Sequence, residues 1–365
     1  MTARRDLVRP QEPLVSSLES RIEPLEPDWE GLAERIGASP FLRPTWIGLW
    51  WRAFGAGELE ILAVRRASRL VGVVPLARRW GSLRGLANWH TPEFGFLAED
   101  RTVSRALARS LVARVRWWGA VSFVDSGRDD LRGLHSAARE RGYRTWSRTL
   151  ERSPYVVTEG EWETYWRGRS KNLRRGLERG RRALGDGLSY DLATGDDGLD
   201  DRLAEILRLE AAGWKARRGT AIVSRPRTEA FYTEVARWAA RRGWLRFLSL
   251  RLGDRTIAMQ LALEHDGVLY LLKGGFDPAY AKFSPGNLLL RATLERAFSA
   301  DVHRCELLGD AEPYKLAWTE ACRDMVALHA FAPSALGRLA WSAMAYGRPA
   351  AKRAGLAPIV HRLRR

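Results

Sequence analysis

The first half of the chain opens on short helical patterns and then alternates between apolar and polar positions. Apolar residues recur at helical spacing over 28–36 and again around Trp46 and Trp50. Two alternating runs follow, at 59–65 and 70–77, and the polar residues between them are typical of a hairpin turn. The pattern therefore predicts helices followed by an antiparallel hairpin.

A second hairpin repeats the first. Residues 62–72 align without gaps on residues 248–258, and in both copies apolar runs and a glycine-containing loop lead into a helix, at 103–115 and at 287–298. We interpret the match as an internal duplication with a degenerate first copy. The alternative is that two exposed hairpins share such alternation without a common origin.

The second half begins with a long basic stretch. Residues 162–184 predict one helix that is rich in arginine, and we expect it to bridge the two domains. After it, helical and strand periodicities alternate. The expected elements are a strand at 188–192, helices at 199–217 and 228–242, and strands at 244–252, 255–263, 268–274 and 304–308.

The order of these elements predicts the fold class. Helices, an antiparallel meander and a loop-to-helix crossover suit an α/β (α+β) fold with a mixed sheet and the crossover helix packed on it. With 365 residues the chain exceeds the usual size of one core, so two domains are expected. The predicted divisions are an irregular lead-in (1–26), a first domain (27–155), a second domain (156–335) and a basic C-terminal helix or tail (336–365).

Charge and cysteine content narrow the class of protein. A net charge of +17 favours an anionic partner, such as a phosphorylated cofactor, nucleic acid or an acidic membrane surface, but charge alone does not choose among them. Two cysteines, Cys305 and Cys322, are too few for a disulfide scaffold and lack the paired spacings that hold zinc. No run approaches the ~18 apolar residues that cross a bilayer, and no secretory signal pattern is present. We expect a cytoplasmic protein without a metal.

The segment from Lys273 to Asn287 joins a strand end, a glycine-bearing loop and a helix start. Ser284 is expected to cap the helix, Pro285 suits its first turn, and the free N–H groups at Gly286 and Asn287 would face an anion. Lys282 would add a point charge. The segment is a candidate phosphate site, and the alternative is a well-capped helix without a ligand.

A second segment places ionisable groups after the strand at 304–308. Asp310, Glu312, Tyr314 and Lys315 offer a base, an acid and a cation at a strand end, where pockets open in such sheets. The alternative is a polar loop before a surface helix.

These residues resemble the CelD-like acetyltransferases, which are associated with cellulose biosynthesis, belong to the GNAT superfamily and are akin to the Fem peptidyltransferases. The resemblance covers roughly residues 162–329. The usual phosphate-binding signature of the GNAT superfamily, Arg/Gln-x-x-Gly-x-Gly/Ala, is absent from this sequence in its strict form. The first half of the chain matches the family only loosely. The matching motifs are Ser170-Lys-Asn-Leu-Arg174-Arg175, Leu209-Glu210 with Trp214-Lys215, Ile257-Ala258, Gly275-Phe276-Asp277, Ser284-Pro285-Gly286 and Gly309-x-x-Glu312-x-Tyr314-Lys315-x-x-Trp318.

The resemblance implies a tandem GNAT-like acyl-CoA N-acyltransferase fold with a degenerate N-terminal copy. It also implies transfer of an acyl group, acetyl in the first instance, from an acyl-CoA to an amine or hydroxyl by direct attack. We assign Glu312 as the base and Tyr314 as the acid near the sulfur, with backbone N–H groups of 268–274 polarising the carbonyl. The expected cofactor-binding residues are Lys282, Phe283, Ser284, Gly286 and Asn287, and the expected substrate-binding residues are Glu210, Trp214, Lys315, His90 and Glu93.

Other candidates carry less chemistry. His303 and Cys305 alternate on a strand beside Glu306, but no second His or Cys pair completes a metal site, and Cys305 lacks a partner base. His90 and Glu93 lie in a loop of the first half that would face a cleft between the domains, which makes them candidates for the acceptor site.

Two rival functions remain open at this stage. A Fem-type transferase would take its donor from aminoacyl-tRNA, with the arginine-rich helix on phosphates. A non-catalytic GNAT-like scaffold would bind a partner or an anionic membrane at the inner membrane face through residues 338–365. The acceptor stays unidentified, and a polysaccharide or cell-envelope precursor follows only from the resemblance.

Overall fold

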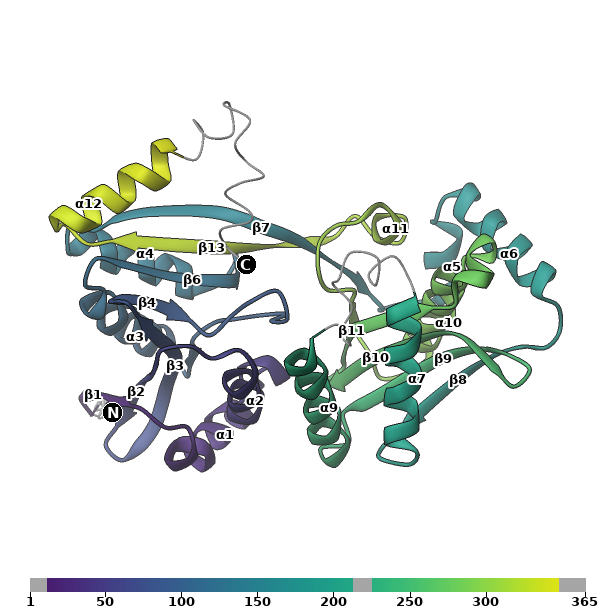
Figure 1. Ribbon diagram of the computed structural model, residues 1–365, viewed down its shortest axis with the longest axis horizontal. Coiled ribbons are helices and arrows are strands. Elements are labelled where there is room, and N and C mark those ends of the chain that lie inside the picture. The colour runs from purple at the N-terminus through teal and green to yellow at the C-terminus, as the bar shows by residue number, and fades with distance from the viewer. Residues whose placement is uncertain (1–11, 213–224, 348–365) are drawn as a thin grey trace, which may run out of the picture.

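The strands of the described residues form one mixed sheet. A computed structural model describes residues 12–212 and 225–347. The strand order is β1-β2-β3-β4-β6-β13-β7-β12-β11-β10-β9-β8, with β5 paired to β3 (Figure 1). The strands are β1 (Leu14–Glu19), β2 (Glu58–Arg66), β3 (Arg69–Arg79), β4 (Ser82–Gly85), β5 (Leu97–Ala98), β6 (Trp118–Asp125), β7 (Arg144–Val157), β8 (Leu188–Thr194), β9 (Leu245–Leu252), β10 (Arg255–His265), β11 (Val268–Phe276), β12 (Arg304–Glu306) and β13 (Cys322–Phe331).

Helices cover this sheet and connect its strands. The amphipathic pattern sets their buried faces, as in α10, where Leu290, Leu294 and Ala297 share one buried face. The helical elements are η1 (Glu23–Leu25), α1 (Glu26–Arg35), η2 (Pro40–Leu42), α2 (Pro44–Phe54), α3 (Arg101–Arg114), α4 (Asp129–Glu140), α5 (Trp162–Arg167), α6 (Lys171–Leu184), α7 (Leu199–Ala212), α9 (Pro226–Arg241), η4 (Pro278–Phe283), α10 (Pro285–Ser299), α11 (Pro313–Leu316), α12 (Ala335–Ser342) and the π-turn η5 (Ala343–Gly347).

The two halves repeat one order of elements. Each half contains a hairpin, a further strand, a helix, a strand, a helix and a last strand, in that order. In the first half these are β2, β3, β4, α3, β6, α4 and β7. In the second half they are β9, β10, β11, α10, β12, α11 and β13. The two aligned stretches, 62–72 and 248–258, occupy equivalent hairpins, β2–β3 and β9–β10. The predicted α/β fold with two related halves is therefore confirmed.

The last strands of the two halves exchange places in the sheet. β13, from the end of the second half, lies between β6 and β7 of the first and is antiparallel to both. β7 in turn runs past β13, and its final residues, Tyr155–Val157, pair with β12 of the second half. These two long strands lie side by side and connect the halves in Figure 1. Neither sheet half is complete without residues from the other.

A shared aromatic core also joins the halves. Phe41 and Trp46 of the first half meet Tyr270 and Phe231 of the second edge to face, at ring-centroid distances of 5.0 and 5.2 Å. Phe41, Trp46 and Phe231 are at most 2% exposed. Burial of such rings contributes about 2–3 kcal/mol each, so this contact holds α2 against α9.

Three expectations about the segments outside the sheet centre were wrong. Residues 162–184 form two helices because Ser170 caps α6 by accepting a hydrogen bond from the Leu173 N–H. They do not bridge the halves, since α5 and α6 pack on α10 and η4 of the second half.

The lead-in is not irregular throughout, because β1 pairs with β2 along its whole length. The helix predicted over 199–217 is described to Ala212, and the basic run beyond residue 347 lies outside the described residues.

Candidate active site

Strand β11 pairs with β12 only over its first three residues. Val268 to Tyr270 lie opposite Arg304 to Glu306 in parallel register. Beyond that point β11 continues to Phe276 on β10 alone, while the chain after β12 turns toward β7 through a bond from the Leu307 N–H to the Pro154 carbonyl. Within the described residues, the β12-facing edge of 271–276 has no strand partner. Backbone donors at this opening are placed to hold an extended ligand or polarise a carbonyl.

The loop after β11 leads directly to the N-terminus of α10. Ser284 occupies the N-cap in a left-handed conformation (φ 56°), and its hydroxyl makes no capping bond, so the predicted side-chain cap was wrong. Gly286 is exposed, and the nearest atom to an added Cβ there is a Phe276 ring carbon at 3.6 Å. The side-chain oxygen of Asn287 accepts a hydrogen bond of 3.0 Å from the buried Trp318 indole. Gly286 is therefore open to an anion, while the Asn287 side chain has a structural role.

The turn after β12 is organised by a buried lysine. The Lys315 ammonium donates to the carbonyls of Leu308 (2.7 Å) and Asp310 (3.0 Å) and lies 3.4 Å from the Glu312 carboxylate. Leu308 and Gly309 both take positive φ to make the turn. Burial lowers the pKa of Lys315, and Glu312 acts in the opposite direction. The Lys315 ammonium thus holds this loop, whereas Glu312 and Tyr314 remain about half exposed at 46% and 50%.

Two residues that the sequence did not single out, Glu151 and Lys273, interact electrostatically with each other and with the predicted site residues. Burial and then the charge of Asp310 raise the pKa of Glu151 to about 6, while Lys315 and Lys273 act to lower it. Burial lowers the pKa of Lys273, although Glu210 and Glu151 favour its charged form. The structure therefore gathers carboxylates and ammonium groups from β7, β11, α7 and the β12 turn. Glu151 belongs to the first half, and nothing in its local sequence marks it.

Comparison with protein families finds one match. Residues 167–316 match the family described as an acetyltransferase (GNAT) domain, and this stretch contains the β11 opening, α10 and the β12 turn. The segment is therefore similar to GNAT acetyltransferase domains, and this similarity supports an acyltransferase.

Solved structures share the fold over most of the chain. FemX aligns with a TM-score of 0.57 at 10% identity, over 87% of this chain and 97% of that one. The C-terminal domain of a putative lysylphosphatidylglycerol synthetase from Agrobacterium fabrum aligns with a TM-score of 0.56 at 12% identity, over 89% and 96%. A comparison with curated proteins finds no match. At these identities the likeness establishes the fold, not the substrate.

The GNAT domain brings some predicted substrate residues together and separates others. Glu210 is 3% exposed at the end of α7, which packs so closely on β11 that a Cβ at Gly275 would lie 2.4 Å from the Glu210 nitrogen. His90 reaches the second half from the first, where its Nδ1 atom lies 3.2 Å from the phenol oxygen of Tyr232. Glu93 instead pairs with Arg128 (2.8 Å) and accepts a hydrogen bond from Ser39. Trp214 lies outside the described residues.

The remaining candidates are structural. Cys305 is fully buried and burial raises its pKa, so the thiol is not poised as a nucleophile. Glu306 is 0% exposed between Arg304 and Arg323, each at 2.9 Å. Within the described parts of the chain no group of three or more His, Cys, Asp or Glu could hold a metal ion. In the same residues no helix has the length and apolarity to cross a membrane.

Proposed function

We propose that the protein transfers an acyl group from an acyl-CoA, acetyl-CoA in the first instance, to an amine or hydroxyl acceptor. The observation that carries the proposal is the opening between β11 and β12 beside the exposed Gly286 at the start of α10. A thioester arm lying along β11 would meet backbone donors, and its diphosphate would meet the positive end of the α10 dipole. Lys282 and Phe283, which are in cation–π contact at 4.9 Å, would flank the phosphates.

The chemistry is a direct displacement. A bond forms between the acceptor nitrogen or oxygen and the acyl carbon, the carbon–sulfur bond breaks, the acceptor loses a proton and the thiolate gains one. Glu312, held at the β12 turn by Lys315, would receive the proton. Tyr314 would supply one to sulfur, since partial burial and the neighbouring Glu312 raise its pKa and keep it protonated at neutral pH.

The acceptor class follows from the likeness to the CelD-like branch. We place it among cell-envelope or polysaccharide precursors, handled in the cytoplasm or at the inner face of the membrane. His90, Glu210 and Trp214 would belong to the acceptor side, and Glu93 would act there only through Arg128.

A second candidate donor is aminoacyl-tRNA, as in Fem-type transferases. The observation that favours it is the row of arginines on α6, which would contact a nucleic-acid backbone. Salt-sensitive binding of tRNA at physiological ionic strength, together with no binding of CoA, would select this donor.

Calorimetric titration with acetyl-CoA and CoA tests the proposal. Gly286→Glu adds bulk and negative charge at the α10 N-terminus with room for its Cβ, so the variant should fold. Gly31→Glu is the matched control, because it adds the same side chain on α1 of the first half, where the nearest atom to a new Cβ is Arg35 at 3.5 Å. We expect micromolar binding that Gly286→Glu abolishes and Gly31→Glu retains. Absence of binding by the wild type would reject an acyl-CoA donor.

A further inference from the structure

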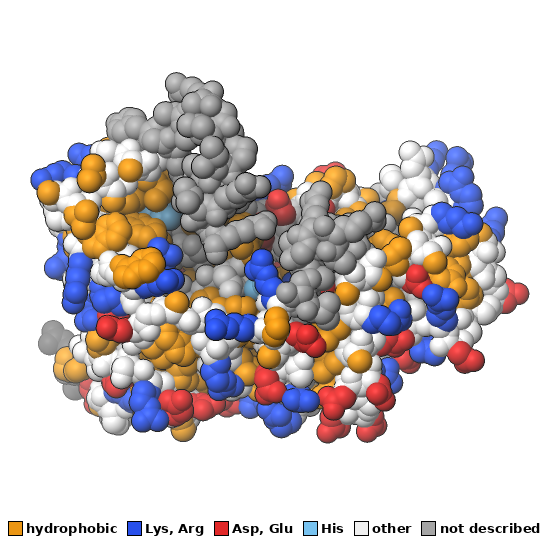
Figure 2. All heavy atoms as spheres, in the orientation of Figure 1, with side chains coloured by type: hydrophobic (Ala, Val, Ile, Leu, Met, Phe, Trp, Pro, Cys, Tyr) orange, Lys and Arg blue, Asp and Glu red, His pale blue; other side chains and the backbone are white. Residues whose placement is uncertain are grey.

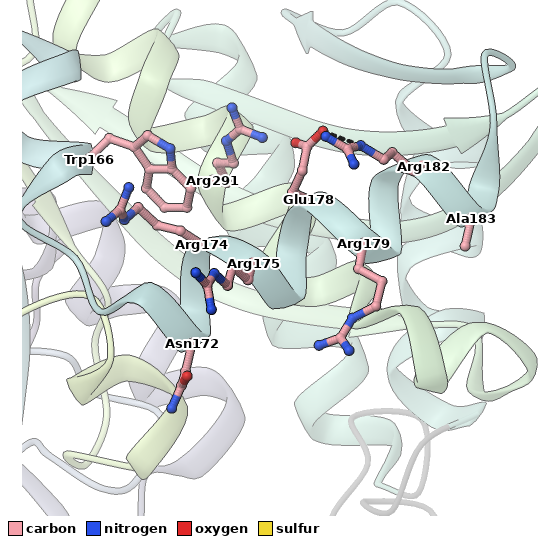
Figure 3. Close-up of a pocket in the computed structure, with 9 residues that line it drawn as sticks. All are labelled: Trp166, Asn172, Arg174, Arg175, Glu178, Arg179, Arg182, Ala183 and Arg291. Carbon is pink, nitrogen blue, oxygen red and sulfur yellow. Dashed lines mark hydrogen bonds and ion pairs between the residues drawn. The ribbon is translucent and has the colours of Figure 1, made fainter.

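A groove of about 1090 Å³ runs along the outer face of α6. Its walls come from α5, α6 and α10, and Figure 3 shows Trp166, Arg174 and Arg291 gathered at one end, with Arg175 and Arg179 continuing along α6. The arginines that line it from α6 fall within an arc of about 140° at 100° per residue. One wide face of the helix is therefore cationic.

The groove holds more positive charge than the protein neutralises. Its one carboxylate, Glu178, is shared by Arg181 and Arg182. Within the described residues, Arg175 and Arg179 have neither a hydrogen bond nor an ion pair. Arg291 stacks on Trp166 at 4.9 Å, and its Nε is buried without a partner. Donors thus face the groove unmatched.

The row of arginines destabilises α6 when no ligand is bound. Arg175 and Arg179 are four residues apart, where like charges repel by about 0.2–0.5 kcal/mol. In the described residues no carboxylate from another element offsets that repulsion. A bound polyanion would offset the repulsion, because guanidinium groups bind phosphate oxygens in pairs of charge-assisted hydrogen bonds. Turns of the helix set successive arginines about 5.4 Å apart, which suits a ligand with several phosphates.

One residue of α10, Arg291, lines the groove, whereas η4 packs on the other side of α6. Helix α6 packs against η4 so closely that a Cβ at Gly180 would lie 2.6 Å from the Phe283 carbonyl oxygen. Arg291 belongs to α10 itself, about 9 Å along the helix from Pro285 at 1.5 Å per residue. A ligand that touches both the α10 N-terminus and the groove would therefore have to be long enough to span this stretch of α10.

We propose that the α6 groove binds the phosphorylated adenosine end of a coenzyme A donor, with Arg175 and Arg179 on its phosphates. The proposal deepens the proposed function and rests on it for the identity of the donor. A nucleic-acid strand is the less favoured ligand, because basic side chains are dense over α6 but mixed with acidic and apolar ones elsewhere on the face that Figure 2 shows.

Calorimetry with CoA and 3′-dephospho-CoA tests the groove. The test variant is Arg175→Glu/Arg179→Glu. The matched control is Arg167→Glu/Lys171→Glu, which makes the same change of charge at exposed neighbouring residues that do not line the groove. We expect wild type and control to bind CoA about tenfold or more tightly than 3′-dephospho-CoA, and the groove variant to bind both weakly without discrimination. Circular dichroism melts verify that each variant folds.

The outcomes separate this inference from the proposed function. If the groove variant binds both ligands as the wild type does while Gly286→Glu abolishes binding, the acyl-CoA donor stands and the groove assignment is overturned. If the wild type binds neither ligand but binds a short RNA through Arg175 and Arg179, both the CoA donor and its adenosine subsite are wrong.

Discussion

The Nδ1 atom of His90 in the first half lies 3.2 Å from the phenol oxygen of Tyr232 in the second. The Lys273 ammonium lies 5.0 Å above the centre of the same phenol ring, and the His90 ring stacks on Phe54 at 5.1 Å. Burial, followed by the charges of Lys273 and Arg225, lowers the pKa of His90 to about 4. The contact between halves is thus built around a neutral histidine.

This histidine should make the stability of the protein depend on pH. The folded pKa of about 4 lies below the unfolded value of 6.5, so the unfolded chain binds the proton first. The contribution is fully present above pH 6.5 and is lost as the pH falls toward 4. The free energy of unfolding, measured with denaturant, should fall between pH 7 and pH 4.5. We expect this fall to be smaller in His90→Gln than in the wild type, by at most about 3 kcal/mol and by less after solvent screening. Parallel curves would contradict this.

The strand exchange predicts that a residue near the C-terminus stabilises the first half. Leu328 on β13 is 3% exposed in the core of the first half, opposite Val121 of β6. Leu328→Ala should cost about 2–5 kcal/mol and speed amide hydrogen exchange in β6. Leu336→Ala is the control, since Leu336 is 54% exposed and should change stability little. Unchanged amide hydrogen exchange in β6 would argue against the placement of β13 in the first half.

Glu312 and Tyr314 should each matter to turnover. We expect Glu312→Gln and Tyr314→Phe to lower the turnover number by ~10² or more, because one removes a base and the other an acid. Both side chains are about half exposed, so both variants should fold. Full activity in both, measured as CoA release with an identified acceptor, would remove them from the mechanism.

Glu151 should shape the acid limb of the activity profile. Its pKa of about 6 means that the carboxylate is lost as the pH falls through 6. If the ionised carboxylate assists the acceptor, kcat/KM of the wild type should decrease as the pH is lowered below 6. In Glu151→Gln this decrease at acidic pH should be absent or smaller. Glu178→Gln, which alters a carboxylate on α6, should leave the limb in place. An identical limb in Glu151→Gln would assign it to another group.

Lys315 should stabilise the β12 turn more than it affects chemistry. Lys315→Met removes the donor to the Leu308 and Asp310 carbonyls and leaves buried acceptors unmatched. We expect a loss of about 1–3 kcal/mol in the free energy of unfolding. Unchanged stability with abolished activity would instead favour direct contact with substrate.

The sequence predicted those features that depend on neighbours along the chain. Alternation over 62–72 and 248–258 located both hairpins because a half-buried strand shows its pattern residue by residue. The apolar spacing over 287–298 located α10, and Pro285 its start. The predicted single helix over 162–184 was wrong because periodicity is insensitive to the break that Ser170 introduces.

The sequence by itself located the two hairpins, α10 and the segment that matches the acetyltransferase family, since propensity and side-chain periodicity are local. Tertiary structure alone decided that β13 completes the first half, that Lys315 bonds back into its own turn, and that Glu151 and His90 reach the second half. The contacts of β13, Glu151 and His90 join residues more than a hundred positions apart, and no local pattern encodes them. The bonds of Lys315 span only five and seven residues, but they depend on the burial of the turn, which its sequence does not show.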